Sequence, residues 1–117
     1  MEKLENNSLY YSDCLSLLER MPESCFTLAY LDPPWNTGSD FIHIEQNEKT
    51  PRRDYFTFIS NVFQQIRRVL NESGTVFVHT NPSLETPFRF ILEQVFEGRF
   101  VTEIILPGKI RHLSRID

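Results

Sequence analysis

The sequence predicts one α/β domain in which a parallel sheet is covered by helices on both faces. Three observations support this fold class. The chain of 117 residues has the length of a single domain. Short apolar runs typical of strands alternate with segments whose apolar residues recur at helical spacing. Their order is strand, helix, strand, loop, helix, strand, helix, strand, which is typical of a three-layer parallel sheet.

The N-terminal elements form the first predicted unit. Residues 9–11 (Leu-Tyr-Tyr) are a short β-favouring run, and Ser12 or Asp13 can cap a short helix that ends at Pro22. Residues 25–31 are continuously apolar, which is typical of a strand buried on both faces of a parallel sheet. Together these elements predict a compact βαβ unit.

A long polar stretch separates this unit from the clearest helix. Residues 32–53 are broken by proline and glycine, which indicates a loop that is either functional or disordered. The helix follows with Asp54 as its cap, and residues 71–74 end it. Its predicted inner face carries Tyr55, Phe58, Ile59, Val62, Phe63, Ile66, Val69 and Leu70.

The C-terminal part alternates strand and helix again. Residues 75–80 are β-branched and apolar and predict a second buried strand. Thr86-Pro87 starts a helix that Gly98 closes, and residues 100–106 predict a last strand. We therefore expect the domain to span residues 1–106 and residues 107–117 to form an irregular basic tail.

The composition excludes several classes of protein. No apolar run is long enough to span a bilayer, so we expect no membrane span, no secretory signal and a cytoplasmic location. Cys14 and Cys25 fit no metal or redox spacing and are expected to be reduced thiols. The net charge is −4, but the first 50 residues hold nine of the 16 acidic and three of the 12 basic residues. The rest of the chain is weakly basic, a weak hint of nucleic-acid binding.

The strongest chemical signal is Asp32-Pro33-Pro34-Trp35, directly after the strand predicted at residues 25–31. Ligands of open parallel sheets bind beyond the carboxyl ends of the strands. The two prolines fix φ and lack N–H donors, so their carbonyls and the carboxylate form a rigid group of acceptors. This group, with an indole to stack on, suits a planar ligand with an exocyclic amino group, such as a nucleobase. The alternative is a Pro-Pro turn with a tryptophan that fills the core.

These residues resemble a family, the S-adenosylmethionine-dependent amino-methyltransferases. The tetrapeptide is similar to the family's motif IV, and residues 31–38 (Leu-Asp-Pro-Pro-Trp-Asn-Thr-Gly) resemble bacterial DNA adenine methyltransferases of the restriction–modification type. Residues 10–15 resemble the family's GDCL segment, with Ser12 in place of the glycine, and residues 68–79 resemble its RVLKPGG-LFVH segment. The resemblance covers about residues 8–106 and implies a Rossmann-like methyltransferase domain, here incomplete.

The resemblance also implies a mechanism. The target base is rotated out of double-stranded DNA, because its amino nitrogen cannot be reached within the stack. Asp32 and the Pro33 carbonyl would accept hydrogen bonds from the adenine N6 amino group, which directs the nitrogen lone pair toward the methyl group of S-adenosylmethionine. Pro34 completes the motif, and Trp35 would stack on the flipped base, a contact worth about 1–3 kcal/mol. An aspartate at position 32 favours adenine over N4-cytosine.

Other residues have weaker assignments. Asn36 is expected to bind substrate, and Arg52 and Arg53 are placed either to contact DNA phosphates or to be solvated. By resemblance Asp13 would contact the adenosyl group of the cofactor, and the alternative is a helix cap. We expect no metal site, because no metal-ligand spacing involves His43, His79 or His112. For His79, a structural role is favoured over one in the pocket.

One family motif is absent from the sequence. The Gly-rich turn Phe-x-Gly-x-Gly, where the backbone approaches the methionine part of the cofactor, needs neighbouring glycines. The chain has four, far apart, at Gly38, Gly74, Gly98 and Gly108. In one permuted class of these enzymes the catalytic half precedes the Gly-rich half. The sequence therefore resembles that first half, and we expect this chain alone to transfer no methyl groups.

Three interpretations follow. The first is an N-terminal part of an adenine-specific DNA methyltransferase, with N4-cytosine or RNA adenosine methylation as alternatives. The second is the catalytic half of a split enzyme, completed by a second chain that supplies the Gly-rich half. The third is a non-catalytic nucleic-acid-binding module. An incomplete sheet also predicts an unpaired edge, an uncovered apolar face and a protein prone to association.

Overall fold

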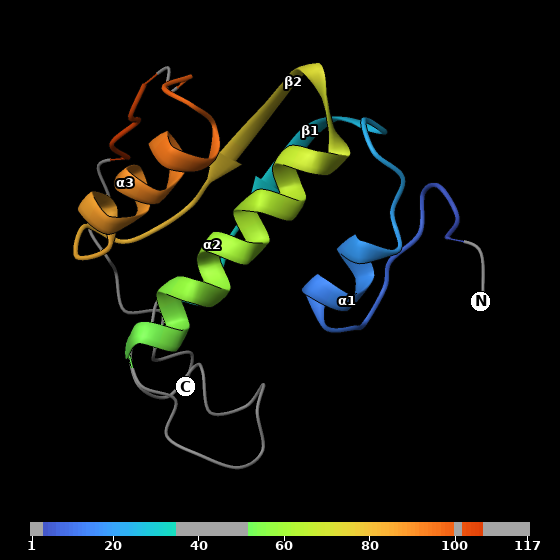
Figure 1. Ribbon diagram of the computed structural model, residues 1–117, viewed down its shortest axis with the longest axis horizontal. Coiled ribbons are helices and arrows are strands. Elements are labelled where there is room, and N and C mark those ends of the chain that lie inside the picture. Colours follow the sequence, from blue (N-terminus) through green and yellow to red (C-terminus); the bar gives the residue numbers. More distant parts are fainter. Residues whose placement is uncertain (1–3, 35–51, 100–101, 107–117) are drawn as a thin grey trace, which may run out of the picture.

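The fold is described by a computed structural model covering residues 4–34, 52–99 and 102–106 (Figure 1). The elements in these ranges are α1 (Cys14–Glu19), β1 (Phe26–Leu31), α2 (Arg52–Val69), β2 (Leu70–Val78) and α3 (Glu85–Val95). The strands β1 and β2 pair in parallel, and α2 connects them, so β1, α2 and β2 form a βαβ unit. The predicted α/β class with a parallel sheet is confirmed, and its third layer stays a prediction.

The short helix α1 begins where the sequence predicts. Asp13 is its N-cap, and the Asp13 carboxylate accepts a hydrogen bond of 2.8 Å from the Ser16 N–H. At the other end, Arg68 of α2 donates to the carbonyls of Leu18 at 2.7 Å and Met21 at 3.0 Å. A guanidinium has five N–H donors, so it can bond both carbonyls at once. Because Arg68 lies on α2, these two bonds hold the end of α1 against α2.

The strand predicted at residues 9–11 is not formed. Leu9 is 99% exposed and Tyr11 is fully exposed, and these residues lie outside any strand. In the described part of the chain the sheet consists of β1 and β2, so this short run has no strand pairing to offset the cost of ordering it. The βαβ unit predicted at the N-terminus is therefore wrong, and the observed unit lies one step further along the chain.

The strand β2 starts directly after α2 and contains an insertion. Phe26 pairs with Leu70 and Leu28 pairs with Thr75, so residues 71–74 oppose the single residue between Phe26 and Leu28. Asn71 shapes the insertion, because its side-chain Oδ1 accepts a hydrogen bond of 3.1 Å from the Ser73 N–H. The helix ends at Val69 and β2 begins at Leu70, so the residues predicted to end the helix, 71–74, lie within β2 instead.

The core lies between the three helices and one face of the sheet. One buried cluster joins α2 to α3 and consists of Tyr55, Ile59, Phe63, Leu84, Phe88 and Val95. A second cluster joins α2 to α1 and consists of Leu18, Val62, Ile66, Val69 and Leu70. The sheet residues packed against these clusters are Ala29, Leu31, Val76 and Val78. The predicted inner face of α2 is confirmed up to Val69, whereas Leu70 is buried as the first residue of β2. The cap predicted at Asp54 is wrong, because α2 begins at Arg52 and Asp54 lies within the helix.

The opposite face of the sheet is exposed. The exposed fractions are 58% for Leu28, 66% for Tyr30 and 46% for Phe77. Successive side chains in a strand alternate between faces, so these three lie on the side away from the core clusters. Burial of β1 on both faces, as predicted, is wrong for the described residues, because their helices pack on the inner side. In the described part of the chain this apolar face is uncovered, as predicted for an incomplete sheet.

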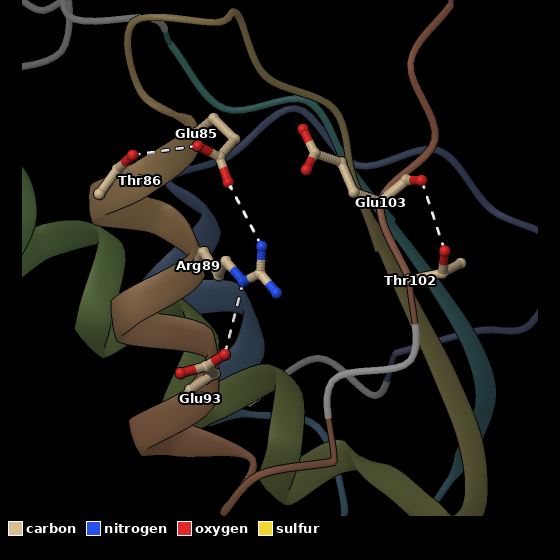
Figure 2. A network of polar contacts seen from close by, with 6 residues as sticks. All are labelled: Glu85, Thr86, Arg89, Glu93, Thr102 and Glu103. Atoms are coloured by element: carbon tan, nitrogen blue, oxygen red, sulfur yellow. Dashed lines mark hydrogen bonds and ion pairs between the residues drawn. The ribbon is translucent and has the colours of Figure 1, made fainter.

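The helix α3 contains Thr86 and Pro87 in its first turn, as predicted. It is closed by Gly98, whose φ is 73° and whose N–H donates to the Glu93 carbonyl at 3.1 Å. On its exposed side Arg89 lies between Glu85 and Glu93, at nitrogen–oxygen distances of 3.9 and 3.5 Å (Figure 2). Such surface pairs contribute little to stability, but they leave Arg89 less available to an anionic ligand.

The last predicted strand is not formed over residues 102–106. All five residues are exposed, and they form neither helix nor strand. Thr102 makes only a local contact among those drawn in Figure 2, a hydrogen bond of 3.4 Å to the carbonyl of its neighbour Glu103. The predicted basic tail at residues 107–117 lies outside the described residues. None of the described helices has the length and apolar character of a membrane span.

Candidate active site at the carboxyl edge of the sheet

The Asp-Pro-Pro sequence lies at the carboxyl edge of the parallel sheet. The last paired residues are Leu31 and Val78, and the next N–H, that of His79, donates to the Leu31 carbonyl at 2.7 Å. Asp32 is therefore the first residue beyond the paired part of β1. Because both strands run in the same direction, their carboxyl ends meet at this edge, where parallel sheets bind ligands.

Asp32 and Pro33 offer two hydrogen-bond acceptors at this edge. Asp32 is exposed and Pro33 is half-buried. Within residues 4–34, 52–99 and 102–106, no group donates a hydrogen bond to the Asp32 carboxylate or to the Pro33 carbonyl. A charged and a neutral acceptor on consecutive residues suit a ligand with two N–H donors on one nitrogen, which is an amino group.

The Pro34 carbonyl differs, because it already has a donor in the protein. The hydroxyl of Tyr55, on α2, donates a hydrogen bond to it. Tyr55 is 1% exposed, and burial raises the pKa of its phenol to about 12, so the phenol keeps its proton at neutral pH. From its place in the apolar stripe of the helix, Tyr55 is predicted only to contribute to the core. The available signal was a hydroxyl on the apolar face of a helix, because a buried tyrosine hydroxyl usually has a partner.

Four other predicted site residues are not tested by the structure. Trp35 and Asn36 lie outside the described residues. Arg52 and Arg53 are the first two residues of α2, and their side chains lie outside the described part. The structure thus brings together only Asp32, Pro33 and Pro34 of the predicted substrate site.

Asp13 is the predicted cofactor contact, and it acts as a helix cap here. Its carboxylate is bound to the Ser16 N–H, so the cap interpretation has direct support and the cofactor contact stays a prediction. Partial burial raises the pKa of the adjacent Cys14 thiol, and the Asp13 charge adds to that effect. Cys14 is therefore a protonated thiol at neutral pH, and both it and Cys25 are free.

His79 and the described acidic residues give no sign of a metal site. Nδ1 of His79 lies 3.3 Å from the Tyr30 hydroxyl, which supports the structural role favoured for this histidine. No group of three or more potential ligands occurs within the described ranges. His43 and His112 lie outside those ranges.

The Arg67-Arg68 pair serves the fold. Arg67 donates to the Val95 carbonyl at 2.6 Å and pairs with Glu97 at 3.2 Å, so it holds the end of α3. Arg68 holds the end of α1, as described above. These two residues are among the basic residues of the second part of the chain, and their guanidinium groups have partners within the protein, so they add no support to the hint of nucleic-acid binding.

The βαβ unit defines an α/β protein, and Asp32, Pro33 and Pro34 lie at the edge of its parallel sheet where proteins of this class bind ligands. Comparison with known families then identifies the family. Residues 26–113, most of the chain, match the DNA methylase model for N6 and N4 methyltransferases. The chain belongs to this DNA methylase family, which confirms the resemblance found in the sequence.

Two relatives are similar to the chain, and their names describe a restriction-modification enzyme subunit and a methyltransferase. The chain is 26% identical over 88 residues to the probable type III restriction-modification enzyme HindVI Mod subunit of Haemophilus influenzae, an alignment that covers 74% of this chain and 12% of that protein. It is 28% identical over 71 residues to the type II methyltransferase M.BglII of Bacillus subtilis, covering 61% and 18% of the two chains. The chain thus spans less than a fifth of the length of either relative.

Proposed function

We propose that this chain binds an adenine rotated out of double-stranded DNA and presents its N6 amino group for methylation by S-adenosylmethionine. The observation that carries the proposal is that, among the described residues, no group donates a hydrogen bond to the Asp32 carboxylate or to the Pro33 carbonyl at the carboxyl edge of the sheet. Membership of the DNA methylase family supports DNA as the substrate.

The chemistry follows from these two acceptors. The amino nitrogen of adenine donates its lone pair into the ring, which makes it a poor nucleophile. Hydrogen bonds from both of its N–H groups to Asp32 and Pro33 favour a geometry in which the lone pair leaves the ring plane. They strengthen as the nitrogen becomes positive during methyl transfer, so they stabilise the transition state more than the bound base. Trp35 would hold the ring by stacking.

N4-cytosine methylation remains the alternative reaction, because the cytosine amino group has the same two donors. An aspartate at position 32 favours adenine by family resemblance. The acceptor pair alone does not distinguish the two bases, so the experiment below compares them directly.

The described residues fit the base better than the cofactor. Gly74 lies in the insertion of β2 and Gly98 follows α3, so neither described glycine lies beside Asp32 at the carboxyl edge. One oxygen of the Asp13 carboxylate caps α1. We infer that a separate Gly-rich part, in the same polypeptide or a second one, supplies the methionine side of the cofactor site. The name of one relative, a Mod subunit, is consistent with a role as part of an assembly.

The proposal extends to location and DNA contacts. A DNA substrate and two free thiols favour the cytoplasm. Arg52 and Arg53 at the start of α2 would contact phosphates, which orients the duplex without reading its sequence.

The test compares unpaired bases in a short duplex of mixed sequence. An unpaired base costs less to extrude, so recognition of the base itself dominates the comparison. We expect the chain to bind a duplex with an unpaired adenine about tenfold more tightly than one with unpaired purine, which lacks the amino group, since a charged hydrogen bond contributes about 1.5 kcal/mol. Asp32→Ala should abolish this preference. Glu72→Ala, which removes an exposed acidic side chain of β2, should keep the preference.

Three outcomes are informative. Equal affinity of the natural chain for adenine and purine would refute the proposal and favour a non-catalytic nucleic-acid-binding module. A preference for unpaired cytosine would favour the N4-cytosine alternative. Transfer of labelled methyl groups to DNA by the purified chain alone would refute the inference that the cofactor site is shared with another part.

A further inference from the structure

The corner formed by Asp32, Pro33 and Pro34 is joined to the core by a buried side chain. Tyr55 lies near the start of α2, and its hydroxyl donates to the carbonyl of Pro34, 21 residues earlier in the chain. Its side chain is 1% exposed. The hydrogen bond therefore joins a residue just after the end of β1 to the first turns of α2.

The position of the Tyr55 hydroxyl is set by the core. The ring stacks on Phe88 with centroids 6.4 Å apart, and it meets Phe56 edge-on at 5.2 Å. Ile59 and Phe63 belong to the same buried cluster. A tyrosine side chain has two rotatable bonds before its hydroxyl, so close packing of the ring fixes where the oxygen lies. The donor is thus placed independently of the corner that it contacts.

The backbone of the corner has one torsion that its own chemistry leaves unfixed. The rings of Pro33 and Pro34 lock both φ angles. The proline at position 34 also restricts ψ of Pro33, because the residue before a proline avoids the helical region. The ψ angle of Pro34 is not restricted in this way. It sets the orientation of the Pro34 carbonyl and the direction in which the chain continues to Trp35.

We propose that Tyr55 is a positioning residue that fixes ψ of Pro34 and so the orientation of the Pro34 carbonyl at the Asp-Pro-Pro corner. The contact also assigns different roles to two neighbouring carbonyls, because Tyr55 donates to Pro34 while no group of the described residues donates to Pro33. The functional meaning of this assignment rests on the proposed function, in which the Pro33 carbonyl accepts a hydrogen bond from the base. The contact with Pro34 does not depend on it.

The chain offers a direct spectroscopic test. It contains one tryptophan, so Pro34–Trp35 is its only proline–tryptophan peptide bond. Labelling proline carbonyl carbons with ¹³C and tryptophan nitrogens with ¹⁵N gives one correlation peak, for the Pro34 carbonyl and the Trp35 amide. Tyr55→Phe removes the hydroxyl and keeps the packed ring. We expect the carbonyl resonance to move upfield in this variant, as carbonyl carbons do when they lose a hydrogen bond.

A matched control separates this effect from general loosening of the core. Phe63→Leu disturbs the same cluster, where Phe63 is 0% exposed, without removing the hydroxyl. It should lower the melting temperature and leave the Pro34 resonance in place.

An unchanged Pro34 resonance in Tyr55→Phe, or an equal change in Phe63→Leu, would overturn the proposal. Neither result depends on base binding or methyl transfer, so the positioning role and the proposed function can fail separately. If both hold, Tyr55→Phe should also reduce the preference for unpaired adenine, while Phe63→Leu should retain it.

Discussion

The two interpretations of Asp13 can be separated by substitution. As a cap, its carboxylate satisfies the Ser16 N–H at 2.8 Å at the start of α1, a helix of six residues. Replacing such a cap with alanine costs about 1 kcal/mol. The helix packs on α2 through buried Leu18 and through the hydrogen bonds from Arg68. Destabilising α1 therefore lowers the stability of the whole domain. Asp13→Ala should therefore lower the free energy of unfolding by about 1 kcal/mol.

The expected change is large enough to measure. With a denaturant slope of about 2 kcal/mol per molar urea, the unfolding midpoint should fall by about 0.5 M. The melting temperature should fall by about 4 °C. Asp13→Asn is the matched control, because asparagine caps helices about as well as aspartate but carries no charge. It should unfold within about 0.3 kcal/mol of the natural chain.

Urea denaturation followed by circular dichroism decides between the outcomes. No loss of stability in Asp13→Ala, or an equal loss in Asp13→Asn, would refute the cap argument. Calorimetric titration then addresses the cofactor. We expect no detectable heat when S-adenosylmethionine is added to the chain alone, and micromolar binding that Asp13→Asn abolishes would show that Asp13 contacts the cofactor.

Three further predictions concern stability and association. Arg68→Met should lower the free energy of unfolding by about 2 kcal/mol in urea denaturation, because two carbonyls of the α1 region lose a charged donor; a loss below about 0.5 kcal/mol would contradict the docking role. Sedimentation equilibrium should show self-association that Leu28→Ser with Phe77→Ser weakens about 30-fold, since each half-exposed side chain offers about 1 kcal/mol of unburied apolar surface; a monomer at all concentrations would argue against this. Burial raises the pKa of Tyr55 to about 12, so above its ordinary value of about 10 the unfolded chain releases a proton that the folded chain keeps. Stability should therefore be intact below pH 10 and fall between pH 10 and 12, and thermal melts of Tyr55→Phe should lack that part of the decrease.

The elements that form as predicted are those with strong local signals. The apolar stripe of α2 and the capping of α1 by Asp13 are both observed, because helical periodicity and cap chemistry act over a few residues. The runs at residues 9–11 and 102–106 also have strand-like composition, yet neither forms a strand. A strand needs a neighbour to satisfy its backbone, and local sequence contains no information about whether that neighbour is present.

The candidate site divides in the same way. The Asp32 carboxylate, the two prolines and their place after a strand follow from the sequence, because the side-chain chemistry and the φ restriction of proline are local properties. The difference between the Pro33 and Pro34 carbonyls does not follow from the sequence, because the donor to Pro34 is Tyr55, which lies on another element. The roles of Trp35, Asn36, Arg52 and Arg53 stay predictions.

The sequence by itself therefore determined the α/β class, the helices, the acceptor-rich corner and the methyltransferase family. Only the tertiary structure decided which face of the sheet is covered by the described helices, where Arg67 and Arg68 bind and which carbonyl of the corner accepts a hydrogen bond from Tyr55. The physical reason is that the first group depends on residues within a few positions of each other. The second depends on contacts between elements distant in sequence, which packing alone brings together.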